Sequence, residues 1–300
     1  MTTTQPVSEG YIPFKGYRTW YQSVGDPAND AARPPLLALH GGPGAPHDYL
    51  ENMAKVAESG CRVIFYDQLG CGRSDKTGKP EMYTVALFVE ELGEVRRALG
   101  LERIHLLGQS WGGMLAMEYA LTQPKGVVSL LIESSPASMP LWVSEANRLR
   151  EELPPDVQAT LLKHEADGTT DSLEYQQAMM VFYDRHVCRI SPPPDFVQRA
   201  FATISPEVYV TMNGPSEFHV TGTLKTWDIT SRLGEIKLPT LLLSGRHDEA
   251  TPTIMARVHS GIRGSEWVIF EQSSHMSHVE EEARWLEVVN EWLSRYDPAQ

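Results

Sequence analysis

The chain alternates between short apolar runs, rich in branched residues, and longer segments with helical spacing of apolar side chains. Such runs, bounded by turn signals, are typical of strands buried on both faces. They lie at residues 36–39, 62–66, 104–107, 128–132, 240–243 and 267–270. Apolar side chains at helical spacing predict helices over 85–99 and 285–292. A weaker pattern at 11–14 and 18–22 predicts an antiparallel hairpin before the first buried strand. We therefore expect the α/β class, with a mostly parallel central sheet flanked by helices.

The alternation stops in the middle of the chain. Between residues 136 and 233 it is replaced by helix-forming sequence punctuated by proline, as in 149–162 and 173–189. The alternation of predicted strands and helices then resumes, which is the pattern that an insertion into a sheet domain produces. We predict a catalytic domain formed by residues 1–135 and 234–300, with a helical cap at 136–233.

Composition and charge narrow the classes of partner. The chain has 300 residues, 41% of them hydrophobic, and a formal net charge of -13 without any run of Lys or Arg. The electrostatic field of this negative charge repels phosphate backbones and anionic lipid, so we expect no nucleic-acid and no membrane partner. The polar segment 1–10 lacks the features of a secretory signal, which favours a cytoplasmic location. Cys61, Cys71 and Cys188 are scattered, and we expect them to be reduced and structural.

A candidate nucleophile lies in the sequence Gly-Gln-Ser-Trp-Gly at 108–112. It follows the predicted strand 104–107 and precedes a helix predicted from 111 to 122. A serine on such a tight strand-to-helix turn has its hydroxyl exposed at the sheet edge. The GxSxG pattern alone is common, so the strand-turn-helix setting is what predicts Ser110 as the nucleophile.

The nucleophile needs a base and an acid, since a serine hydroxyl attacks only when an imidazole accepts its proton. In this kind of sheet the chain order is serine, acid, histidine, on loops after later strands. Asp248 follows the run 240–243 and His275 follows the run 267–270. We predict Asp248 as the acid and His275 as the base.

Two neighbours stay open as alternatives. Glu133 also ends a predicted strand, from which its carboxylate could reach the imidazole. His278 is close to His275, but we expect it to begin the last helix and point elsewhere. Six further histidines are interpreted as surface or packing residues, namely His47, His105, His164, His186, His219 and His259.

A second glycine-rich segment, His-Gly-Gly-Pro-Gly at 40–44, follows the first buried run. Acyl transfer builds negative charge on the carbonyl oxygen, which backbone N–H groups can stabilise by several kcal/mol. We predict that Gly42 and Trp111 supply these N–H groups and that His40 braces the loop. Phosphate binding is disfavoured because a Walker lysine and the GxGxxG spacing are absent.

Together, the segments at 40–44, 67–74 (DQLGCGRS) and 108–112 resemble the proline iminopeptidase family of serine aminopeptidases. The resemblance spans nearly the whole chain, since 213–218 and 245–252 also match. It implies an α/β-hydrolase fold with a helical cap. It also implies cleavage of the amide bond after a free N-terminal residue through an acyl-enzyme, without a metal or organic cofactor.

One departure concerns substrate preference. Leu69 stands where typical members carry Arg, and the pattern is closer to the branch of the tricorn-interacting aminopeptidase and the L-prolinamide and amino-acid amidases. A strict preference for N-terminal proline is therefore left open. The resemblance also implies that Glu217 and Glu249 bind the substrate's amino group. An ammonium in a closed pocket needs such carboxylates, and their position selects the chain end.

Three alternative functions remain. The first is an amidase that releases ammonia from amino-acid amides such as prolinamide, and the second is a small-ester hydrolase, which the paired acids disfavour. The third is a binding protein that kept the fold without its chemistry. The expected partner is a small peptide or amino-acid amide, and the expected assembly is a monomer or small homo-oligomer. Periodicity does not place the cap side chains Met139, Trp142, Met179, Phe182 and Tyr183.

Overall fold

The computed structural model describes residues 5–297, which build one eight-stranded sheet in the order β1-β2-β4-β3-β5-β6-β7-β8. The strands are β1 (Val7–Phe14), β2 (Tyr17–Val24), β3 (Leu36–Leu39), β4 (Val63–Tyr66), β5 (Ile104–Gln109), β6 (Val127–Glu133), β7 (Thr240–Gly245) and β8 (Glu266–Phe270). β1 and β2 form an antiparallel hairpin, β2 pairs antiparallel with β4, and every later pairing is parallel. The predicted α/β class is confirmed.

Helices pack on both faces of this sheet and at one of its ends. They are α1 (Val85–Ala98), α2 (Trp111–Leu121), α3 (Met139–Arg150), α4 (Pro155–Asp167), α5 (Leu173–His186), α6 (Asp195–Ala202), α7 (Pro206–Met212), α8 (Pro252–Gly261), α9 (Ser277–Glu280) and α10 (Glu282–Ser294). The 3-10 helices are η1 (Pro27–Asn29), η2 (His47–Ser59), η3 (Pro80–Met82), η4 (Thr223–Thr226) and η5 (Thr230–Glu235). α1, α2 and α8 pack on one face, and η2 and α10 pack on the other.

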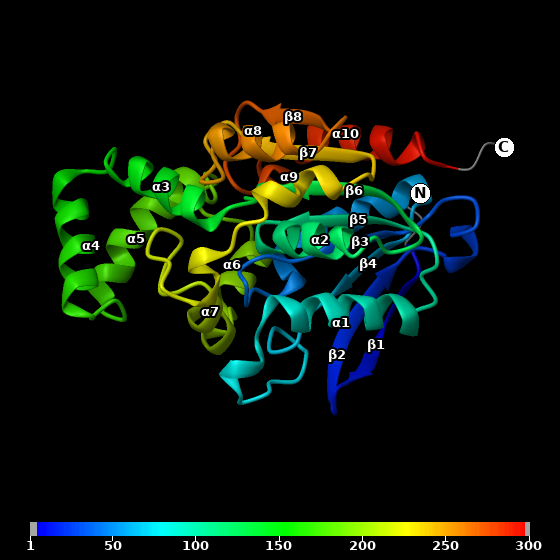
Figure 1. The fold of residues 1–300 in the computed structure, drawn as a ribbon, viewed down its shortest axis with the longest axis horizontal. Coiled ribbons are helices and arrows are strands. Elements are labelled where there is room, and N and C mark those ends of the chain that lie inside the picture. Colours follow the sequence, from blue (N-terminus) through cyan, green and yellow to red (C-terminus); the bar gives the residue numbers. More distant parts are fainter. Residues whose placement is uncertain (1–4, 298–300) are drawn as a thin grey trace.

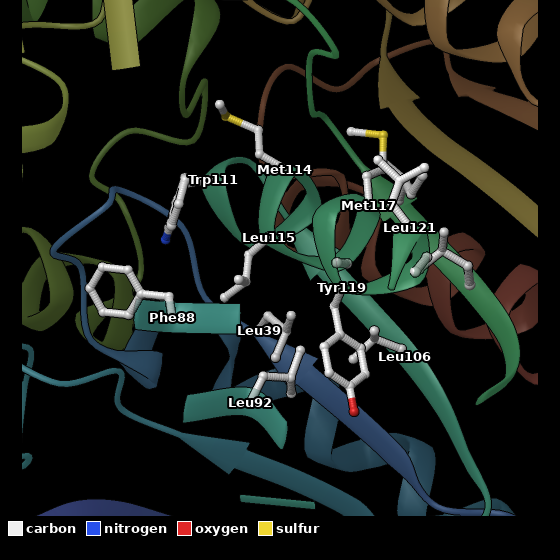
Figure 2. Close-up of a cluster of buried hydrophobic side chains, with 14 of the residues drawn as sticks. Leu39, Phe88, Leu92, Leu106, Trp111, Met114, Leu115, Met117, Tyr119 and Leu121 are labelled. Atoms are coloured by element: carbon white, nitrogen blue, oxygen red, sulfur yellow. The ribbon is translucent and has the colours of Figure 1, made fainter. Parts of the chain in front are cut away.

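The core explains why the strands read as continuous apolar runs. All four residues of β3 are buried, and they alternate between the two clusters on opposite faces of the sheet. A strand covered on both sides has no position that favours a polar side chain. Figure 2 shows one of the two faces, where Leu39 and Leu106 of the strands lie near Phe88 and Leu92 of α1 and Leu115 of α2.

The chain between β6 and β7 forms the helices α3 to α7, which gather at one end of the sheet (green to yellow in Figure 1). α3, α4 and α5 share an apolar cluster of their own. The helix-forming stretch 149–162 is divided, because α3 ends at Arg150 and α4 begins at Pro155. Proline lacks the backbone N–H that a helix interior needs and favours the first helical position. The domain limits 1–135, 136–233 and 234–300 stay a prediction.

The cysteines and the N-terminal segment complete the comparison with the sequence. Cys61, Cys71 and Cys188 are all buried and free, and burial raises the pKa of Cys188 to about 11. Of the polar segment 1–10, residues 1–4 lie outside the described residues and the end belongs to β1. No helix within residues 5–297 combines the length and apolar character needed to cross a membrane.

Candidate active site

Ser110 occupies the sharp turn between β5 and α2. Its φ of +56° and ψ of -124° place a non-glycine residue in a rarely populated backbone region, which is a local strain that functional sites often hold. Glycines at 108 and 112 allow the backbone of this turn to pack closely against neighbouring backbone atoms. A Cβ on Gly108 would lie 2.1 Å from the carbonyl oxygen of Gly112, and one on Gly112 would lie 2.2 Å from that of Leu39. The turn sets Ser110 in the lining of a cavity beneath the cap helices.

Asp248 and His275 meet beside this cavity. Each follows one of the neighbouring parallel strands β7 and β8, so both loops leave the same edge of the sheet. The Nδ1 atom of His275 lies 2.8 Å from Oδ1 of Asp248, and both side chains are buried. With Nδ1–H donating to the carboxylate, Nε2 is the nitrogen left to accept a proton. His275 and Ser110 line the same cavity, so the predicted base and the predicted nucleophile face a common space.

Glu133 and His278, the two alternatives, pair with each other instead. Glu133 Oε1 lies 3.0 Å from His278 Nδ1 and accepts from the Ser277 hydroxyl at 2.7 Å, while Oε2 accepts from the indole of Trp285 at 3.1 Å. Burial acts to raise the pKa of Glu133, but the charge and hydrogen bonds of His278 outweigh it, so this pKa lies below its usual value. The geometry assigns this pair to the buried framework beneath the site.

Replacing each of the two acids, Glu133 and Asp248, by its amide separates a structural role from a catalytic one. We expect Glu133→Gln to lower the free energy of unfolding by roughly 3–5 kcal/mol, because it breaks a buried charged pair, while folded enzyme keeps its kcat within a few-fold. We expect the matched Asp248→Asn to lower kcat by about 10⁴-fold without comparable loss of stability. Urea unfolding and turnover of the folded fraction measure both. A folded Glu133→Gln enzyme as inactive as Asp248→Asn would make Glu133 the orienting acid.

The two predicted N–H donors flank Ser110. Gly42 has a φ of +106°, and a Cβ there would lie 2.6 Å from the nitrogen of Gly44, so this position requires glycine. Trp111 is the first residue of α2, and the N–H groups of a first helical turn have no acceptor within their helix. Gly42, Ser110 and Trp111 together line a narrow recess that adjoins the cavity. Their role as an oxyanion hole is part of the proposal below.

A buried hydrogen-bond chain joins the three parts of the site, and sequence reasoning missed it. The N–H of Gly41 donates to the hydroxyl of Tyr49 at 2.6 Å, and this hydroxyl donates to Oε1 of Gln109, also at 2.6 Å. The amide nitrogen of Gln109 donates to the carbonyl oxygen of His275 at 3.0 Å. Gln109 is the variable second position of GxSxG and Tyr49 belongs to no motif, so neither carried a signal.

Gln68 forms a second bridge, between the glycine-rich loop and α2. Its Oε1 accepts from the indole N–H of Trp111 at 2.8 Å, and its Nε2 donates to the carbonyl oxygen of His40 at 2.9 Å. The backbone N–H of Gln68 donates to Nε2 of His40 at 2.8 Å. Burial lowers the pKa of His40 to about 4, so the ring is neutral and can accept this bond. His40 therefore holds the loop, and the segment 67–74 contributes contacts that support the site.

Glu217 and Glu249 face the cavity with little compensation for their charge. Glu217 Oε1 accepts from the Tyr209 hydroxyl at 2.5 Å, while Glu249 Oε2 is buried without a hydrogen-bond partner in the structure. Glu249 Oε1 lies 3.7 Å from His275 Nε2. Burial raises the pKa of both carboxyls, and for Glu249 the nearby charge of Glu217 raises it further. A bound cation would relieve this repulsion and lower both pKa values.

The cavity also settles the cap residues that periodicity could not place. Its volume is about 300 Å³, and Met179 and Tyr183 of α5 line it. Met139 and Trp142 of α3 line the narrow recess that adjoins the cavity at Ser110. Phe182 points instead into the cluster shared by α3, α4 and α5. Within residues 5–297 no three potential metal ligands come together, and cofactor-free chemistry stays a prediction.

The pH dependence of the site follows from His275. Burial acts to lower the pKa of His275, but the charge and hydrogen bond of Asp248, with further support from Glu217 and Glu133, raise it above the ordinary value of about 6.5. A general base acts only when neutral. We therefore expect kcat/KM for a neutral ester to fall as pH drops through a midpoint above 6.5.

The variant Glu217→Gln tests what sets the midpoint of this pH–rate profile. Glu217→Gln removes one of the charges that raise the pKa of His275, so the midpoint should move to lower pH while Asp248 still orients the ring. A pH–rate profile of both proteins on the same neutral ester measures the shift. An unchanged or higher midpoint in Glu217→Gln would contradict this electrostatic account.

A serine on a strand-to-helix turn of a doubly covered, mostly parallel sheet defines the class of α/β hydrolases, and the sequence profile of that fold family matches residues 34–282. A proline iminopeptidase of Clostridium botulinum is 41% identical over 97% of this chain and 99% of its own length. The crystal structure of VinJ superposes with a TM-score of 0.93 at 46% identity, covering 96% of this chain and 99% of that one. The crystal structure of proline iminopeptidase from Mycobacterium smegmatis has a TM-score of 0.88 at 44% identity, covering 97% and 99%. The chain belongs to the proline iminopeptidase family within this class.

Proposed function

We propose that this protein is a serine aminopeptidase that cleaves the amide bond after a free N-terminal residue. The observation that carries the proposal is the pair of carboxyls, Glu217 and Glu249, in the cavity that also holds Ser110 and His275. The pair suits a positively charged chain end, and the serine beside it suits acyl transfer. Family membership supports the same activity, since the relative from Clostridium botulinum is named a proline iminopeptidase.

In the first half of the reaction the substrate acylates the enzyme. The substrate's ammonium lies between Glu217 and Glu249, which brings the first carbonyl carbon to Ser110. The Ser110 hydroxyl attacks that carbon while Nε2 of His275 accepts the proton, and Asp248 holds the imidazolium through Nδ1–H. The N–H groups of Gly42 and Trp111 hydrogen-bond the developing oxyanion.

The second half returns the enzyme to its starting state. The Nε2–H of the His275 imidazolium donates its proton to the leaving amine, so the C–N bond breaks and the first product departs. A water then attacks the acyl-enzyme, with His275 again accepting a proton, and the N-terminal amino acid is released from Ser110. Each step uses only groups of this chain and water.

Blocking the substrate's amine tests the proposal. We expect hydrolysis of prolyl or alanyl anilide and a large loss on the corresponding N-acetyl anilide, because the acetylated nitrogen carries no charge for the two carboxylates. Comparable kcat/KM on both substrates would overturn the aminopeptidase assignment and favour a general amidase or esterase.

The amidase alternative differs only in the leaving group. Ammonia needs almost no room, whereas the cavity of about 300 Å³ on the His275 side leaves space for much more. This observation favours peptides and larger amides over prolinamide, and direct comparison of prolinamide with Pro-X dipeptides and their amides decides it. A cytoplasmic location and a monomeric or small homo-oligomeric state stay predictions.

A further inference from the structure

Two hollows of very different character meet at Ser110. A narrow recess is lined by Trp111, Met139 and Trp142, and the cavity of about 300 Å³ extends beneath α5 and α6. The two share Gly42, Ser110 and Glu217, so a substrate bound at Ser110 can extend into both. His275 lines only the large cavity.

This difference orients the substrate. In the proposed reaction His275 must protonate the leaving amine, so the leaving group lies on the side of the serine that His275 faces. That side is the large cavity. The narrow recess is then left for the side chain of the N-terminal residue. Glu217 lines both hollows and Glu249 lines the large cavity, so an ammonium held between them lies where the two hollows meet.

The large cavity is lined mostly by apolar side chains, which include Met179, Met180, Val187, Phe201, Ile204 and Met276. Its acidic and basic side chains are Glu217, Glu249 and His275, and none of the described residues that line it is Lys or Arg. The second residue of a dipeptide would bring its free carboxylate into these walls, close to two other carboxyls. Burying an unpaired charge is costly, whereas burying methylene groups is favourable.

The cavity has a neighbour on the outer surface of the cap. Met179, Met180 and Pro215 also line a surface hollow of about 390 Å³, together with Leu173. Leu173 and Met180 are 68% and 42% exposed, so apolar side chains of α5 reach the surface at this hollow. Methionine side chains are unbranched and adaptable, so they suit a wall that a long chain passes. The apolar lining therefore continues from Ser110 to the surface of α5.

We propose that the preferred leaving group is a long, apolar, uncharged amine, so that the best substrates are aminoacyl alkylamides or arylamides. Peptides fit the same description when their second residue is apolar and their terminal carboxylate lies well beyond the cavity. This inference rests on the proposed aminopeptidase function and adds the class of amine that the enzyme releases.

A series of prolyl n-alkylamides, from ethyl to octyl, tests the apolar part of the proposal. Because each buried methylene contributes about 0.8 kcal/mol, kcat/KM should rise roughly two- to fourfold per added methylene until the cavity is filled. Pro-Leu and its amide Pro-Leu-NH₂ test the charge. We expect the amide to exceed the dipeptide in kcat/KM by at least about tenfold, since only the dipeptide brings a carboxylate into the cavity.

A positive charge placed in the wall of the cavity should weaken the preference for Pro-Leu-NH₂ over Pro-Leu. In Met180→Lys an ammonium reaches the junction of cavity and surface hollow, so kcat/KM for Pro-Leu should rise relative to Pro-Leu-NH₂ and the gain per methylene should shrink. Leu162→Lys, on an exposed position of α4 that lines neither hollow, is the matched control and should leave both ratios unchanged.

A flat response to chain length, equal rates on Pro-Leu and its amide, or equal effects of the two lysine variants would overturn the leaving-group proposal. If prolyl anilide is cleaved under these conditions, the aminopeptidase function survives that failure. If neither prolyl anilide nor any member of the series is cleaved, both proposals fail together.

Discussion

Replacing Ser110 by alanine should lower kcat on prolyl or alanyl anilides on the order of a million-fold, leaving only the residual effect of substrate binding and the oxyanion donors. The reason is that, in the proposed reaction, alanine removes the hydroxyl that attacks the bound carbonyl while His275 accepts the proton. Initial rates at saturating substrate measure the loss. Ser135, buried at the same end of the sheet, offers a matched Ser135→Ala control, which should keep most of the activity.

Ser110→Ala should also fold normally. Alanine keeps the Cβ that Ser110 already presents at its strained φ, so we expect the melting temperature to stay within a few degrees of the unchanged protein. Turnover above a hundredth of the original rate, in a preparation free of contaminating hydrolase, would show that Ser110 is not the nucleophile.

Replacing Glu217 or Glu249 by glutamine should be the second largest change. Each variant keeps the shape of the pocket but removes one negative charge that faces the substrate's ammonium. Losing one partner of a buried charged contact costs roughly 2–5 kcal/mol, so kcat/KM for free-amine substrates should fall by about 30- to several thousand-fold. Hydrolysis of a small neutral ester, which makes no such contact, should change far less.

Tyr209→Phe is the matched control for Glu217. It removes the hydroxyl that donates to Glu217 but leaves the carboxylate in place, so its loss on free-amine substrates should be much smaller than that of Glu217→Gln. Parallel losses of Glu217→Gln on free-amine substrate and neutral ester, at equal pH relative to each midpoint, would remove the ammonium-binding role.

The fold was predictable because its signals are local. Strands buried on both faces must be apolar along their whole length, so runs such as 104–107 and 240–243 stand out in the sequence. The turn at Ser110 was equally visible, since only glycine fits at 108 and 112, where a Cβ would strike backbone atoms. Both kinds of signal depend on neighbours that are close in sequence.

The contacts around the site were not predictable, because their partners are distant in the chain. Nothing near Tyr49 indicates that its hydroxyl bridges Gly41 and Gln109, and nothing near Glu133 indicates that His278, 145 residues later, pairs with it. The sequence could name both Asp248 and Glu133 as acids at strand ends. Only the three-dimensional arrangement pairs the first with His275 and the second with His278.

Labelling with a fluorophosphonate tests the central claim most directly, because this reagent reacts with a serine whose hydroxyl is activated by an imidazole. We predict one phosphonyl adduct per chain, located by peptide mass mapping on Ser110, with anilide hydrolysis lost in proportion to labelling. Labelling should fail in His275→Ala. An adduct on another residue, or full turnover in a chain labelled at Ser110, would contradict the account.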